Sequence, residues 1–148
     1  MKRPLRNIAS SVLTVTLLSI STVGYAQTAV HLGGWSHHII TDGLNSSHNA
    51  VMIEQGDWLV GRFTNSYDQP TSAIAYGQTW EKGNWKVSVH GGLVYGYSDC
   101  YSDKGDGRTW CPMVYPSLSY TKHRVQPTVG LIGEAFVLTI RVDLGDIL

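Results

Sequence analysis

Hydrophobic and polar residues alternate with a period of two along most of the chain after residue 27. Between residues 135 and 144, one face carries Phe136, Leu138, Ile140, Val142 and Leu144. The opposite face of this segment carries Val137, Thr139, Arg141 and Asp143. No long window shows the spacing of an amphipathic helix. The alternation predicts about eight strands, at residues 29–40, 48–54, 57–65, 71–81, 84–97, 112–121, 124–131 and 135–144.

Short and long connections largely alternate between these segments. The short links are Gln55-Gly56, Lys82-Gly83 and Lys122-His123, and the longer ones are residues 41–47, 66–70 and 98–111. The last link on the long side, near Gly133, is also short. Bacterial outer-membrane barrels have short periplasmic turns and longer outer loops, and an even strand number closes them without edges. The sequence therefore predicts an all-β fold, an eight-stranded antiparallel up-and-down transmembrane β-barrel.

The chemistry of the two faces favours the membrane form of such a barrel. Large aromatic residues fall near the strand ends, as an interfacial girdle requires: Trp58, Trp80, Trp85, Tyr95, Tyr97, Tyr120 and Phe136. The opposite face carries small residues together with Lys86, His90, Arg124, Arg141 and Asp143. Small residues and paired charges suit the narrow interior of a barrel of this size. Alternation alone also fits a sandwich or a lipocalin-like barrel, so a soluble secreted β-barrel remains an alternative.

The first residues have the composition of a secretory signal peptide. Lys2, Arg3 and Arg6 precede an uncharged apolar stretch at residues 8–23, and Gly24-Tyr25-Ala26 supplies small residues for cleavage. A single membrane anchor is the alternative, but the apolar run is short for one. We expect residues 1–26 to be removed, and residues 27–148 to form a β-barrel domain in the outer membrane of a Gram-negative bacterium.

Export changes the meaning of the two cysteines, Cys100 and Cys111. In an oxidising compartment such a pair is expected to form a disulfide. Two cysteines without nearby histidines do not complete a zinc site, and we expect no metal and no cofactor. The formal net charge is +0, and without a basic patch we expect no nucleic-acid partner.

The predicted topology gathers candidate catalytic residues at the outer rim. His37 and His38 lie late in the first strand, and Asn65-Ser66 ends the third. A serine becomes a nucleophile when a base such as histidine accepts its proton, and Asn65 could orient that base or stabilise an oxyanion. Adjacent histidines on a strand point to opposite faces, so at most one faces the interior. The alternative is structural, because Asn-Ser is a common turn pair.

A longer stretch, WLVGRFTNSYDQPTSAIAYGQTWEKGNW, resembles the third and fourth strands of the lipid A palmitoyltransferases of Gram-negative outer membranes. The resemblance implies an eight-stranded barrel with a catalytic Asp-Ser pair on an outer loop and a catalytic histidine near the end of the first strand. The corresponding positions are Asn65-Ser66, where asparagine replaces the aspartate, and His37 or His38. Ser36-His37-His38 and Asn65-Ser66-Tyr67 are also similar to motifs of small barrels of bacteria and their phages.

Three functions follow as hypotheses. The first is a monomeric lipid acyltransferase, with Ser66 as nucleophile or polar anchor, His37 or His38 as base and Asn65 as orienter. Its substrate would be a phospholipid or the acyl chain of lipid A, taken from the outer leaflet of the bilayer. The second is a non-catalytic structural or surface-interaction barrel whose disulfide-tied loop meets a partner. The third is the soluble secreted barrel.

Overall fold

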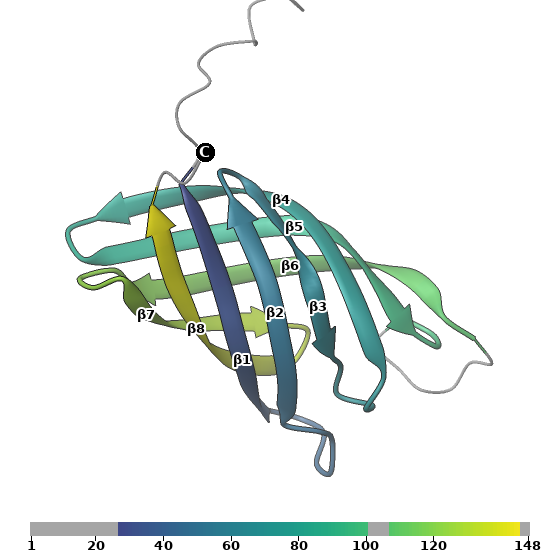
Figure 1. The fold of residues 1–148 in the computed structure, drawn as a ribbon. Coiled ribbons are helices and arrows are strands. Elements are labelled where there is room, and N and C mark those ends of the chain that lie inside the picture. Colours follow the sequence, from purple (N-terminus) through teal and green to yellow (C-terminus); the bar gives the residue numbers. More distant parts are fainter. Residues whose placement is uncertain (1–26, 101–106, 146–148) are drawn as a thin grey trace, which may run out of the picture.

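In the computed structural model, residues 27–100 and 107–145 are described, and they form one closed antiparallel barrel (Figure 1). Its strands are β1 (Thr28–His38), β2 (Ser47–Gln55), β3 (Trp58–Thr64), β4 (Pro70–Lys82), β5 (Trp85–Tyr97), β6 (Thr109–Tyr120), β7 (Val125–Ile132) and β8 (Ala135–Gly145). Each strand pairs with its neighbour in sequence, and β1 pairs with β8. The predicted all-β, eight-stranded, up-and-down barrel is confirmed for this part of the chain.

The two ends of the barrel differ in their connections. One end, the turn end, carries the short links at residues 56–57, 83–84 and 121–124, together with the C-terminal end of β8 (Figure 1). The other end, the loop end, carries residues 39–46, 65–69, 98–100, 107–108 and 133–134. The predicted signal peptide, residues 1–26, lies outside the described residues. Within residues 27–100 and 107–145 no helix is long and apolar enough to cross a membrane.

The outward face of the barrel is apolar over the middle of the strands and aromatic near both ends. Exposed aliphatic side chains in the middle include Leu32, Val51, Ile53, Val60, Ile74, Val87, Leu93, Val114, Leu118, Val129 and Leu138. Exposed aromatic side chains are Trp58, Tyr76, Trp80 and Trp85 towards the turn end, and Trp35, Tyr95, Trp110 and Phe136 towards the loop end. Several pack pairwise, with ring centroids 5.1 Å apart for Trp58–Tyr76 and 5.2 Å for Tyr95–Trp110.

An ion cluster fills the interior near the turn end. Glu54 of β2 accepts hydrogen bonds from Lys86 Nζ at 2.6 Å and Arg141 Nη2 at 2.9 Å. Its other oxygen lies 2.9 Å from His31 Nε2, and Arg141 also donates to Gln126 Oε1 at 2.6 Å. The predicted interior positions of Lys86 and Arg141 are confirmed.

Two expected orientations are wrong. Arg124, expected inside, is exposed because it belongs to the β6–β7 turn, where its Nε donates to the carbonyl of Asp143 at 3.2 Å. Tyr97, expected in the outer girdle, is buried in the interior. The register between β5 and β6 shifts between Tyr95 and Tyr97, and this irregularity turns the tyrosine inward.

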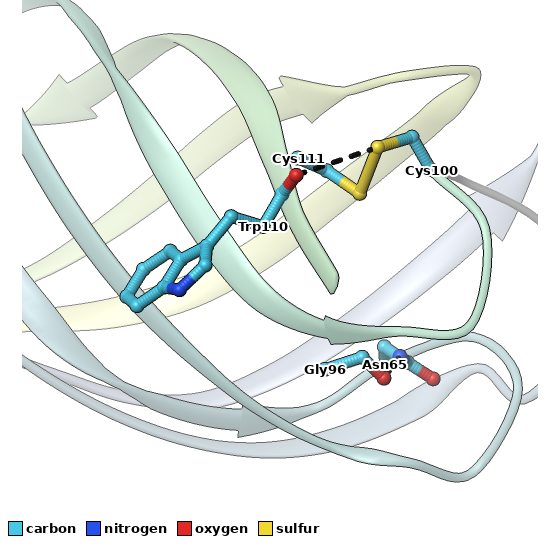
Figure 2. The surroundings of a disulfide bond; sticks show 5 residues. All are labelled: Asn65, Gly96, Cys100, Trp110 and Cys111. Atoms are coloured by element: carbon cyan, nitrogen blue, oxygen red, sulfur yellow. Dashed lines mark hydrogen bonds between the residues drawn. A yellow bond between two sulfur atoms is a disulfide. The ribbon is translucent and has the colours of Figure 1, made fainter. Parts of the chain in front are cut away.

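The predicted disulfide between Cys100 and Cys111 is present, and Figure 2 shows it at the start of β6. The two Cα atoms are 5.2 Å apart, and Cys111 is fully buried against the interior hydrophobic cluster. The bridge therefore ties Cys100, shortly after β5, to the wall of the barrel.

Candidate functional site

The loop-end half of the barrel encloses a cavity of about 340 Å³. Most of its lining is apolar and includes Met52, Leu59, Phe63, Tyr97, Met113 and Tyr115. Its polar lining includes His38, His48, Asn65 and Ser66, which come from β1, β2 and the β3–β4 loop. The volume lies within the range of small-molecule sites, which are mostly apolar with a few polar groups. The cavity is therefore the candidate site among the described residues.

Asn65 holds the turn between β3 and β4. Its Oδ1 accepts hydrogen bonds from the backbone N–H groups of Tyr67 at 2.9 Å and Gln69 at 3.0 Å. Its Nδ2 donates to the carbonyl of Gly96 at 3.3 Å, and the two residues lie side by side in Figure 2. Asn65 is 1% exposed, and its side-chain amide forms these hydrogen bonds with backbone groups. This geometry matches the structural alternative for the Asn-Ser pair.

Replacing Asn65 tests this turn role. Asn65→Ala removes the acceptor of two backbone N–H groups, and we expect the free energy of unfolding to fall by about 1–3 kcal/mol. Asn65→Asp keeps that acceptor but replaces the Nδ2 donor with an oxygen that faces the Gly96 carbonyl. We expect its loss of stability to be smaller than that of Asn65→Ala. Urea unfolding in detergent, followed by tryptophan fluorescence, measures both. An Asn65→Asp protein less stable than Asn65→Ala would contradict the assignment.

Ser66 lines the cavity from the next position in the chain. Its backbone carbonyl accepts a hydrogen bond from Asn45 N at 2.9 Å, which joins the β1–β2 loop to the β3–β4 loop. Ser66 is partly buried. The loops therefore hold this serine at the wall of the cavity. This is the end of the barrel at which the sequence placed the candidate catalytic residues.

The two histidines at the end of β1 are separated as their alternation requires. His37 is exposed on the outward face, whereas His38 lines the cavity. His38 Nδ1 lies 3.8 Å from Glu134 Oε1, and its Nε2 lies 3.4 Å from Ser36 Oγ. Of the two candidate bases, His38 is the one placed at the site.

Another histidine contact was missed by the sequence analysis. His48 Nε2 lies 2.6 Å from Ser36 Oγ, and His48 Nδ1 lies 2.7 Å from the carbonyl oxygen of Thr64. From the sequence, Ser36 was named only as part of a motif, and no role was assigned to His48. The sequence did contain one signal, because Ser36 and His38 are two residues apart and therefore face the same side of β1. An irregularity in β1 turns that side towards the interior.

That irregularity is a bulge built on adjacent glycines. Gly33 pairs with Ala50, but Trp35 pairs with Ser47, so the register of β1 against β2 shifts between them. Gly33 and Gly34 have φ angles of 87° and 106°, which residues with a side chain rarely adopt. Odd-numbered residues such as His31 therefore face the interior before the bulge. Even-numbered residues such as Ser36 face it after the bulge. A β-bulge re-aims side chains in this way.

No model of a known protein family matches the chain, and no characterised protein shows significant similarity to it. The site is therefore interpreted from its own geometry.

Proposed function

We propose that this protein is a small outer-membrane β-barrel that acts as a lipid acyltransferase, taking an acyl chain of a phospholipid or lipid A into its loop-end cavity. The observation that carries the proposal is the cavity itself, an apolar chamber with Ser66 and His38 in its wall. An acyl chain gains free energy by leaving water for such a lining. The serine and imidazole would meet the ester that joins the chain to its headgroup.

The outward face supports membrane insertion. An aliphatic band between aromatic side chains near both ends matches the hydrocarbon core and interfacial girdles of transmembrane barrels. Tryptophan and tyrosine favour the interfaces because their rings are apolar and their N–H or O–H groups polar. A soluble secreted barrel would expose this large apolar surface to water, which monomeric soluble proteins rarely do.

The interior supports a chamber in preference to a channel. The ion cluster around Glu54 occupies the lumen at the turn end, and the cavity occupies the loop-end half. In outer-membrane barrels the longer loops face outward. The cavity would then lie at the depth of the outer leaflet, which contains lipid A.

A weak seam between β6 and β7 supports lateral entry of a lipid. In the described part of the chain, these strands pair only at Ser117↔Gly130, Leu118↔Val129 and Ser119↔Thr128. The next residue of β6 towards the loop end is Pro116, which has no N–H to donate. Met113, Tyr115 and Ile132 flank this part of the seam and also line the cavity. A chain leaving the bilayer here would reach the cavity directly.

Mass spectrometry of lipid A and phospholipids tests the proposal in cells that express the protein. We expect a newly acylated or deacylated species with the wild type, and about a hundredfold less with Ser66→Ala, the size of loss when a polar contact to the reacting group disappears. Ser46→Ala, at an exposed position of the same end, is the matched control.

Unchanged lipids, with the protein confirmed in the outer membrane, would favour the non-catalytic barrel. Recovery of the protein in the soluble periplasmic fraction would favour the soluble barrel.

A further inference from the structure

The structure assigns a nucleophile and base pair to Ser36 and His48, because His48 lines the loop-end cavity and Ser36 Oγ lies within hydrogen-bond distance of its ring. We infer that Ser36 Oγ attacks the lipid ester and that His48 Nε2 accepts its proton. This inference rests on the proposed acyl transfer and specifies which serine forms the acyl-enzyme. Ser66 then serves as the polar anchor for the lipid.

The hydrogen bonds of His48 determine that Ser36 donates its hydroxyl proton and that His48 Nε2 accepts it. The carbonyl oxygen of Thr64 can only accept, so the His48 Nδ1 that lies 2.7 Å from it must carry hydrogen. In the neutral ring Nε2 is then an acceptor, and the Ser36 hydroxyl 2.6 Å away must donate to it. This is the arrangement that a general base needs, with a third group orienting the ring.

The base of the pair is held rigidly and lines the cavity, and Ser36 is partly exposed beside it. His48 is 5% exposed and lines the cavity, so its ring is fixed between β1 and β3 while one face meets the chamber. His38, which also lines the cavity, lies 3.4 Å from Ser36 Oγ on the adjacent inward position of β1. Ser36 therefore sits between two imidazoles that both face the chamber.

The reaction balances without a cofactor. Ser36 Oγ forms a bond to the acyl carbon as its proton moves to His48 Nε2. The ester C–O bond then breaks, and the leaving alcohol takes that proton from His48. A hydroxyl of the acceptor lipid attacks the acyl-serine in the second half, its proton passing through His48 to Ser36 Oγ. The net change exchanges one alcohol for another on the acyl group.

A serine–histidine hydrogen bond can also be purely structural, so the first test does not depend on lipid turnover. Both cysteines of the chain form the disulfide, so Ser36→Cys introduces a unique thiol. We expect Ser36→Cys to be alkylated by iodoacetamide at more acidic pH than Ser46→Cys, because His48 takes the thiol proton. Adding His48→Gln should abolish the difference. Equal pH profiles of the two thiols would overturn the inference.

The second test uses a fluorophosphonate probe and lipid turnover with the purified full chain in detergent. We expect the probe to label Ser36, and His48→Gln to reduce labelling and turnover by about 10²–10⁴-fold. Ser46→Ala, at an exposed position of the same end, should keep its labelling. A wild type that turns over lipid while Ser36→Ala remains active, or a probe attached to Ser66, would overturn the inference and leave the proposed function standing. A wild type without lipid turnover, but with the His48-dependent thiol reactivity, would instead contradict the proposed function.

Discussion

Glu54→Gln is expected to lower the free energy of unfolding by about 3–5 kcal/mol, because it removes the only carboxylate that contacts Lys86 and Arg141 in the described interior. Lys86 and Arg141 are 4% and 1% exposed, so water cannot replace the lost partner. Glutamine keeps the shape of the side chain. The expected loss therefore reports the charge, not the packing.

Lys86→Met is the informative comparison. The cluster holds two cations for one carboxylate, so removing Lys86 leaves Glu54 paired with Arg141 at 2.9 Å. We expect this variant to lose less stability than Glu54→Gln. Breaking a buried pair is costly mainly when it leaves an unpaired charge. The double variant Glu54→Gln/Lys86→Met should recover part of the loss of Glu54→Gln.

Unfolding by urea in detergent micelles, followed by the fluorescence of the five tryptophans, measures all three variants. The heat-dependent shift of the folded barrel on a gel provides an independent reading. If Glu54→Gln unfolds at the urea concentration of the wild type, the ion cluster contributes no net stability. If Lys86→Met is the less stable of the two, the charge balance described above is wrong.

The strands were predictable because a barrel wall repeats one simple rule. Each residue of a strand faces either the outside or the lumen, so residues 135–144 and 124–131 display their two faces directly in the sequence. Lys86 and Arg141 could be placed inside by the same rule. Their anion could not be identified, because pairing across the lumen joins β2 to β5 and β8, and the alternation of one strand carries no information about partners.

The site was only partly predictable for a related reason. Bulges in β1 and β5 exchange inward and outward positions near the loop end, so alternation extrapolated from the middle of a strand fails there. For this reason the sequence did not place Ser36 in the interior, and it placed Tyr97 on the outward face. His38 and Ser66 could be placed at one rim because the connections bring their strand ends together there. Asn65 was identified in the sequence as part of the Asn-Ser pair. Its role in the turn follows from the hydrogen bonds of its amide, which the sequence does not contain.

Gly92→Val is expected to cost about 3 kcal/mol or more, at or above the upper end of typical overpacking, since the added side chain would meet backbone. Gly92 pairs with Ala75 of β4 and faces the interior. A Cβ at Gly92 would overlap the carbonyl oxygen of Ile74 and lie 2.5 Å from Ala75 Cα. Neither atom can move without separating β4 from β5. We expect most of the variant protein to fail the gel-shift test for a folded barrel.

Gly91→Val is the matched control one residue away. Gly91 is exposed on the outward face, and a Cβ there meets nothing within 4 Å. Valine suits a strand and adds apolar surface to the outward band, so we expect stability equal to or slightly above that of the wild type. Equal stability of the two variants would show that β4 and β5 separate readily at this point. The interior would then be wider at this point than the close approach at Gly92 indicates.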